Sequence, residues 1–192
     1  MTWDKSVFQQ RRAGVLLHPR SLPATSQGNR LNRWFDFMHQ SGLSVWQILP
    51  LGVPHADGSP YQTQSVFAVD PLLFPEVAEM YGTVDLSSDE FSFFCQQQAH
   101  WLEDFAHYMV LKRLYLGRPW YSWLAPHRDR ETGAMEKIRK QYKDELIAIK
   151  WQQYKLLDFW HEMHMQAESQ GIIIFGDLPI FVAHDSADVW AH

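Results

Sequence analysis

Three aspartates follow a short apolar run near the end of the chain: Asp177, Asp185 and Asp188. The run, residues 172–175, is expected to form a fully buried strand. Carboxylates just beyond the C-terminal end of a parallel strand lie where α/β barrels and open sheets place their active sites. Two carboxylates about 5 to 10 Å apart could cleave a glycosidic bond. They could instead accept hydrogen bonds from sugar hydroxyls, or Asp185 or Ser186 could cap the next helix. Spacing alone leaves these three roles open.

A second candidate for chemistry is the tetrapeptide from Ser59 to Gln62. Pro60 fixes its own φ, so Tyr61 and Gln62 can be presented rigidly. A tyrosine ring suits the apolar face of a sugar, and a glutamine side chain both donates and accepts hydrogen bonds. The pattern therefore suits hydroxyl recognition, and its alternative is an ordinary turn with a surface tyrosine.

The histidines do not indicate a metal site. His161 and His164 are three residues apart, whereas the zincin motif needs histidines four residues apart. We therefore expect them on an exposed helix face and expect no bound metal. His18 and His184 lie at predicted strand ends and are better candidates for polar contacts in a site. The sequence also contains no glycine-rich phosphate loop, nucleophile elbow or CxxC pair.

The elements that must position these residues alternate between strands and helices. Apolar runs predict strands at 13–17, 44–51 and 172–175, and apolar spacing predicts helices at 30–40, 87–116 and, as one long or two shorter helices, 134–170. Asn29 is the expected cap of the first helix. The first strand, helix and strand fit a right-handed βαβ unit. Residues 52–81 form a long irregular stretch, which inside a compact domain is usually functional. The order is typical of the α/β class.

Composition limits the partners and the compartment. The 192 residues carry a formal net charge of -5, which argues against nucleic acid or an anionic membrane as a partner. One cysteine, Cys95, allows no intrachain disulfide and fits a reducing cytosol. No apolar stretch approaches the roughly 18 to 20 residues of a membrane span. We therefore expect a cytoplasmic protein, with most of its nine tryptophans in the core.

Four motifs stand in a fixed order along the chain. They are GVLLHPRSLP at residues 14–23, WQILPLG at 46–52, SPYQ at 59–62 with its continuation to residue 73, and GDLPIFVAHDSADVW at 176–190. Together they resemble the 4-α-glucanotransferase family, also called amylomaltases or glycoside hydrolase family 77. Residues 24–32, with Gly28 as their single glycine, have fewer glycines than the family usually has there. The resemblance spans nearly the whole chain.

The resemblance implies a (β/α)8 barrel that transfers α-1,4-glucan segments by a retaining double displacement, without a metal or organic cofactor. This chain would form about the first three strands, with a helical insertion between strands two and three. Residues 1–86 would begin the barrel, residues 87–170 would be the insertion, and residues 171–192 would hold the third strand and the truncated start of its site loop. The substrate would be a maltooligosaccharide.

The resemblance also assigns roles to single residues. Tyr61 matches a tyrosine that packs on the sugar at the cleavage subsite, and Asp185 matches an aspartate that binds hydroxyls there. Ser59, Gln62 and Asp177 match positions that line or support the site.

The family's nucleophile, acid/base glutamate and third essential aspartate would lie beyond residue 192. No catalytic residue is therefore expected in this chain, and the resemblance favours substrate binding for the three aspartates. The alternatives are a non-catalytic fragment with at most weak glucan binding, or assembly with a separate polypeptide that supplies the rest of the barrel.

Overall fold

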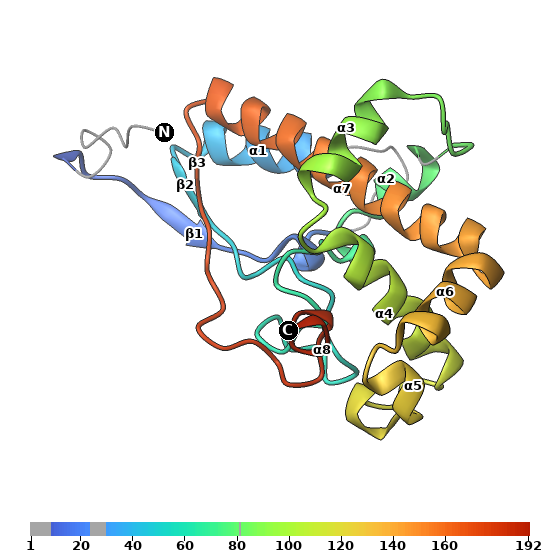
Figure 1. The fold of residues 1–192 in the computed structure, drawn as a ribbon. Coiled ribbons are helices and arrows are strands. Elements are labelled where there is room, and N and C mark those ends of the chain that lie inside the picture. Colours follow the sequence, from blue (N-terminus) through green and yellow to red (C-terminus); the bar gives the residue numbers. More distant parts are fainter. Residues whose placement is uncertain (1–8, 24–29, 81) are drawn as a thin grey trace. The chain divides into compact units, whose positions relative to one another are not determined.

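A three-stranded parallel sheet confirms the predicted α/β class (Figure 1). Its strands are β1 (Gly14–Leu16), β2 (Val45–Gln47) and β3 (Ile173–Phe175), in the spatial order β1-β2-β3. Both pairs are parallel, and the register aligns Val15 with Trp46 and Trp46 with Ile174. All three strands lie within the predicted apolar runs.

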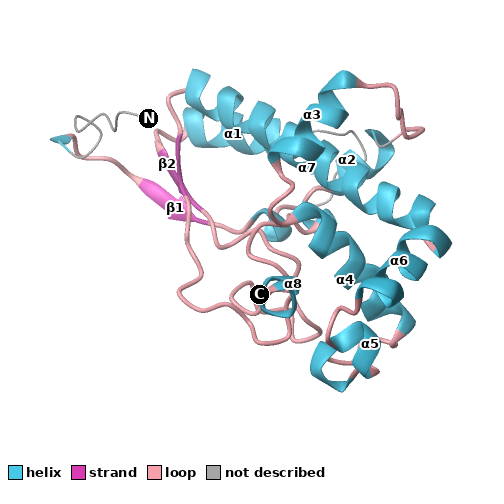
Figure 2. Cartoon of the chain, viewed as in Figure 1, coloured by secondary structure: helices cyan, strands magenta, loops and turns pink. Residues whose placement is uncertain are grey.

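The computed structural model describes residues 9–23, 30–80 and 82–192. The helices are α1 (Arg30–Gln40), α2 (Pro75–Met80), α3 (Asp89–Gln97), α4 (Leu102–Leu114), α5 (Ala125–Arg128), α6 (Thr132–Gln141), α7 (Lys143–Ser169) and α8 (Ala187–Ala191), with 3₁₀ turns at Pro19–Ser21, Pro71–Leu73 and Trp120–Ser122 (Figure 2). The chain divides into two units, the first from residues 1–49 and 160–178 and the second from residues 50–159 and 179–192. No helix in the described ranges is both long and apolar enough to cross a membrane.

Trp46 is the centre of the first unit. It is fully buried, and its ring packs against Trp34 and Phe35 of α1 and Trp160 of α7 at centroid distances of 5.7 to 6.2 Å. Its indole Nε1–H donates to the carbonyl oxygen of Leu17 at 2.7 Å. A buried indole N–H needs an acceptor, so this bond allows the Trp46 side chain to be fully buried within the first unit.

The prediction that the third strand is fully buried is wrong. Phe175 is 51% exposed, and Ile173 and Ile174 are only partly buried. Leu16 of β1 is 53% exposed as well. An apolar run indicates what a strand can bury, but burial also requires a layer packed on each face of the sheet.

Helices build the second unit. Its core contains Tyr108 and Leu111 of α4, Trp190 of α8, and Trp123. Ring contacts of 5.5 to 6.1 Å join Tyr108, Trp123 and Trp190. The expectation that tryptophans are mainly core residues is confirmed for the buried members Trp46, Trp101, Trp123, Trp151 and Trp190.

The helical region follows the prediction in outline and differs at its breaks. The predicted helix at 87–116 divides into α3 and α4, and Ser88 caps α3 by accepting a bond from the N–H of Phe91 at 3.1 Å. The predicted region 134–170 divides into α6 and α7. Helix α2 forms inside the stretch predicted to be irregular, beginning at Pro75, whose fixed φ suits a first helical position. The predicted cap Asn29 and residues 24–29 of the glycine-poor segment lie outside the described residues.

Candidate functional site

The loop that carries Tyr61 is a tight hairpin in the second unit. Pro54 and Thr63 form an antiparallel bridge, and the N–H of His55 donates to the carbonyl oxygen of Gln62 at 3.0 Å. Gly52 makes this packing possible, because a Cβ there would lie 2.7 Å from Thr63 Cγ2 and 2.9 Å from the carbonyl oxygen of Ser65. The hairpin therefore has a fixed base.

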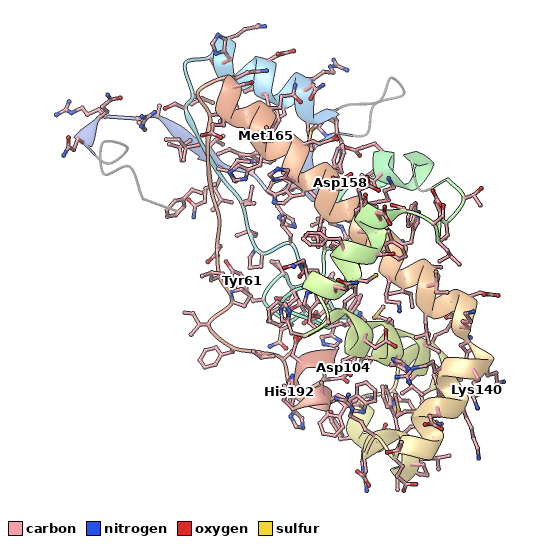
Figure 3. The ribbon with its side chains drawn as sticks, turned by 45° about the horizontal axis from the view of Figure 1, so that its top comes forward. Tyr61, Asp104, Lys140, Asp158, Met165 and His192 are labelled. Atoms are coloured by element: carbon pink, nitrogen blue, oxygen red, sulfur yellow. The ribbon has the colours of Figure 1, made fainter. Side chains whose placement is uncertain are left out.

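The tip of this hairpin carries the predicted residues Ser59, Tyr61 and Gln62, of which Figure 3 labels Tyr61. Gly58, with a φ of +71°, turns the chain, and Ser59 Oγ accepts a long hydrogen bond of 3.4 Å from the N–H of Tyr61. The N–H of Gln62 donates to the carbonyl oxygen of Ser59 at 3.2 Å. Tyr61 is 46% exposed and Gln62 is exposed as well. An exposed ring beside an exposed amide on a fixed turn is able to contact a ligand.

Helix α8 holds this hairpin through Asp188. The Asp188 carboxylate accepts from the Oγ–H of Ser65 at 3.1 Å and from the N–H of Val66 at 2.9 Å. The N–H of Ala187 donates to the carbonyl oxygen of Gln64 at 2.8 Å. Two neighbouring residues of α8 thus bind the strand-like segment that leads away from Tyr61.

Asp185 binds helix α4 and the turn at Trp120. Its Oδ1 accepts from the hydroxyl of Tyr108 at 2.9 Å and from the N–H of Trp120 at 3.1 Å. Its Oδ2 forms an ion pair with Nζ of Lys112, whose side chain is 10% exposed. Ser186, and not Asp185, caps α8, because its Oγ accepts from the N–H of Val189 at 3.2 Å.

These contacts fix the charge state of Asp185. Burial alone would raise the pKa of its carboxyl group, but the hydrogen bonds from Lys112, Tyr108 and Trp120 bring that pKa below its usual value. Burial and the nearby Asp185 carboxylate raise the pKa of the Tyr108 hydroxyl. Asp185 is therefore an ionised acceptor near neutral pH, and Tyr108 is a neutral donor.

Asp177 follows β3 and belongs to the first unit, so it is described apart from the other predicted residues. Its side chain is partly buried. His18 is in the same unit, and burial, followed by the charge of Arg20, lowers the pKa of its imidazole. His161 and His164 are exposed, as predicted for a solvated helix face. No group of metal-ligating side chains is found in the described part of the chain.

A cavity of about 530 Å³ opens in the first unit and contains none of the predicted site residues. Its described lining is Leu22, Pro23, Arg30, Arg33, Trp34 and Phe37. The Arg30 side chain donates to the carbonyl oxygens of Pro19 and Leu22 at 3.1 and 3.4 Å. These bonds join the start of α1 to the turn after β1.

Tyr108, Lys112 and Trp120 were missed at the level of sequence. Lys112 lies four residues after Tyr108, on the same face of α4. A lysine on a helical face that is otherwise apolar is the signal that could have indicated a buried partner of opposite charge. Nothing in the spacing could have identified that partner as Asp185, which is 73 residues away.

Comparison with known proteins gives consistent similarities. The profile of the family described as 4-alpha-glucanotransferase matches residues 17–80 and 77–192. The chain is 34% identical to the 4-alpha-glucanotransferase of Thermus thermophilus, over 95% of this chain and 45% of that protein. It is 32% identical to the one from Synechocystis, over 97% and 46%. The chain thus spans somewhat less than half the length of these relatives.

Solved structures agree with the sequence relatives. The structure of an amylomaltase from Streptococcus agalactiae in complex with acarbose superposes with a TM-score of 0.83 at 26% identity, over 94% of this chain and 46% of the other. The amylomaltase from Corynebacterium glutamicum gives a TM-score of 0.67 at 16% identity. The second similarity concerns the fold alone.

Proposed function

Because the chain belongs to the 4-alpha-glucanotransferase family, we propose that its protein transfers segments of α-1,4-linked glucan to the 4-hydroxyl of an acceptor. The family match, which covers residues 17–192 in two overlapping segments, is the observation that carries this proposal. The reaction would be a retaining double displacement, as in glycosidases that form a covalent glycosyl-enzyme. The acarbose complex of the related amylomaltase supports a maltooligosaccharide-like substrate.

We propose that β1, β2 and β3 are the first three strands of a (β/α)8 barrel. Residues 1–86 would begin the barrel, residues 87–170 would be a helical insertion, and residues 171–192 would carry the third strand and the start of its loop. The parallel order β1-β2-β3 supports this arrangement, because a barrel of this type has parallel strands in sequence order. The single cysteine, which allows no intrachain disulfide, suits a cytoplasmic location, which we propose as well.

We propose that the chain contributes substrate contacts and not the catalytic pair. Tyr61 would pack on a sugar ring, with Ser59 and Gln62 supporting it. Asp177, in the first unit, would be a substrate contact of its own. Asp185 would accept one hydroxyl hydrogen bond, because a carboxylate has about four acceptor positions and protein donors use three of them.

Asp185 and Asp188 are unsuited to act as acid and nucleophile. A general acid needs a raised pKa, and the pKa of Asp185 is lowered. Both oxygens of Asp188 accept protein hydrogen bonds. These contacts favour the second candidate function for the chain by itself, which is glucan binding without chemistry.

A polypeptide that supplies further barrel strands is a third proposal. Leu16 of β1 and Phe175 of β3, on the two outer strands of the described sheet, are about half exposed. Outer strands with exposed apolar side chains can pair with additional strands.

The test is a titration of the 192-residue chain with maltoheptaose, together with an assay of glucose release from maltotriose. We expect a dissociation constant on the order of millimolar and no glucose release. Tyr61→Ala should weaken the binding free energy by about 1 kcal/mol, a value within the range measured for aromatic contacts. Phe93→Ala is the matched control, because Phe93 is an exposed ring of the same unit, on α3.

The outcomes separate the candidates. Glucose release by the chain would show that the carboxylates within it are sufficient for transfer. Binding that Tyr61→Ala leaves unchanged would refute the role of Tyr61. Absence of binding at high maltoheptaose concentration would remove the glucan-binding proposal for this chain.

A further inference from the structure

Trp120, Tyr121 and His184 form an aromatic cluster at the surface of the second unit. The rings of Tyr121 and His184 are stacked, with centroids 5.1 Å apart and planes 23° apart. Trp120 lies 5.4 Å from His184 and 5.9 Å from Tyr121. Tyr121 is 51% exposed and His184 is exposed as well. Three rings thus meet where solvent reaches them.

Hydrogen bonds between side chains and backbone groups hold the cluster in place. The indole Nε1–H of Trp120 donates to the carbonyl oxygen of His184 at 2.7 Å. The N–H of Trp120 donates to Asp185 Oδ1 at 3.1 Å. Ser122 closes the 3₁₀ turn by donating from both its N–H and its Oγ–H to the carbonyl oxygen of Pro119. Two segments 64 residues apart therefore present the rings in one arrangement, which lowers the ordering cost of binding.

Trp120 is partly buried and packs against the core of the unit, whereas Tyr121 and His184 remain exposed. Trp123, two residues after Tyr121, is 3% exposed and stacks on Tyr115 within the core of the unit. The same short segment thus sends one aromatic ring inward and keeps another at the surface. Rigid aromatic side chains at a surface supply contact area at low entropic cost.

The chemistry of the neighbourhood suits a sugar. A pyranose ring has an apolar C–H face that packs on aromatic rings, and hydroxyl groups at its edge that need polar partners. The Tyr121 hydroxyl and the His184 ring nitrogens supply such partners on the rings themselves, and the Asp185 carboxylate accepts from the N–H of Trp120 in the same cluster. Asp185 directly follows His184 in the chain.

We propose that Trp120, Tyr121 and His184 form a stacking platform for a glucose unit of an α-glucan, adjoining Asp185. This inference rests on the proposed glucan substrate and extends it to a second contact region, separate in sequence from the Tyr61 hairpin. Tyr121 supplies the most accessible ring. Trp120 is a positioning residue whose indole N–H fixes His184.

The test follows maltoheptaose binding by NMR, using the tryptophan indole N–H signals. The Trp120 signal is assigned from its loss in Trp120→Phe. Tyr121→Ala should weaken binding about five- to tenfold, the range expected for an aromatic contact, whereas Tyr121→Phe should stay within about twofold of wild type because it keeps the ring. His184→Ala should also weaken binding, since it removes a ring but keeps the carbonyl that Trp120 contacts. Phe93→Ala is again the matched control and should bind like wild type.

The outcomes distinguish this inference from the proposed function. If Tyr61→Ala weakens binding but Tyr121→Ala and His184→Ala do not, the platform is wrong and the glucan site at the hairpin stands. If wild type binds but the Trp120 indole signal does not move, the platform is also wrong. If maltoheptaose does not bind at all, the platform and the glucan-binding proposal for this chain are both overturned. Equal thermal midpoints of wild type and His184→Ala show that a lost affinity is not lost folding.

Discussion

Asp185→Asn isolates the charge of the contact between α4 and the segment before α8. The substituted side chain keeps the shape and an acceptor oxygen for Tyr108 and Trp120. It places an amide NH2 where Oδ2 faced the Lys112 ammonium, so two donors meet. The side chain of Lys112 is 10% exposed and cannot recover full hydration.

The magnitude follows from the degree of burial. Breaking a fully buried ion pair from one side costs about 3 to 5 kcal/mol, whereas an exposed pair contributes about 0 to 1 kcal/mol. With side chains 10% and 21% exposed, the Lys112–Asp185 pair is closer to the buried case. We expect Asp185→Asn to lower the free energy of unfolding by about 2 to 3 kcal/mol. With an ordinary urea dependence, the unfolding midpoint would fall by about 1 M or more.

The assay is equilibrium unfolding in urea followed by tryptophan fluorescence. Asp129→Asn is the control, because Asp129 forms an ion pair with Arg128 on the surface of the same unit and its loss should leave the midpoint unchanged. Adding Lys112→Met to Asp185→Asn should recover part of the loss, since it removes the uncompensated ammonium. A midpoint for Asp185→Asn equal to that of wild type would refute the reasoning.

Three further predictions concern Asp185, Asp188 and Gly14. Because the folded-state pKa of Asp185 is lowered, its stabilisation is complete above the usual aspartate pKa of about 3.9 and is lost as the pH falls through the lowered value. Thermal midpoints of wild type and Asp185→Asn should therefore begin to converge below about pH 4 and meet only below the lowered pKa. Asp188→Ala should lower the free energy of unfolding by about 1 to 2 kcal/mol and speed hydrogen exchange at the Val66 amide. Asp188→Asn can still accept from that amide and donate to Ser65, so it should preserve both the stability and the slow exchange. Gly14→Ala should destabilise the sheet by about 1 to 3 kcal/mol in urea unfolding, because its Cβ would lie 2.7 Å from the carbonyl oxygen of Val45, whereas Gly133→Ala, with no atom within 4 Å of its Cβ, should not destabilise.

Local patterns predicted the strands and most helices, because strand and helix periodicities depend on neighbouring residues. Helix α1 forms at the expected residues 30–40, and its apolar positions Leu31, Phe35 and Met38 are buried. The break between α3 and α4 was missed because residues 98–101 contain no proline or glycine. The exposure of Phe175 was missed because burial of a strand depends on distant layers, and a local run carries no information about them.

The candidate site was predictable only where its residues are close in sequence. Ser59, Tyr61 and Gln62 lie on one turn, and Pro60 and Gly58 mark that turn locally. No local sequence pattern indicates the long-range contacts of Asp185 and Asp188. The roles assigned to Tyr61, Asp185, Ser59, Gln62 and Asp177 as substrate contacts stay predictions.

The segment after β3 shows why a cluster of carboxylates does not by itself indicate catalysis. The carboxylate oxygens of Asp188 accept hydrogen bonds from Ser65 and Val66, at the base of the hairpin that carries Tyr61. The carboxylate oxygens of Asp185 accept hydrogen bonds from Tyr108 and Trp120 and form an ion pair with Lys112. Each aspartate accepts hydrogen bonds from a segment more than sixty residues away, so each is a long-range anchor.

The two anchors act on the two surfaces proposed to contact glucan. Asp188 fixes the segment after Tyr61, and Asp185 fixes the turn that presents Trp120 and Tyr121. Because Asp185 and Asp188 are only three residues apart, displacement of α8 would loosen the hairpin and the aromatic platform together. If the anchors position both surfaces, Asp188→Ala should weaken maltoheptaose binding although Asp188 itself contacts no sugar, and Asp188→Asn should retain it. Equal weakening by both substitutions would instead place the Asp188 charge in direct contact with the glucan.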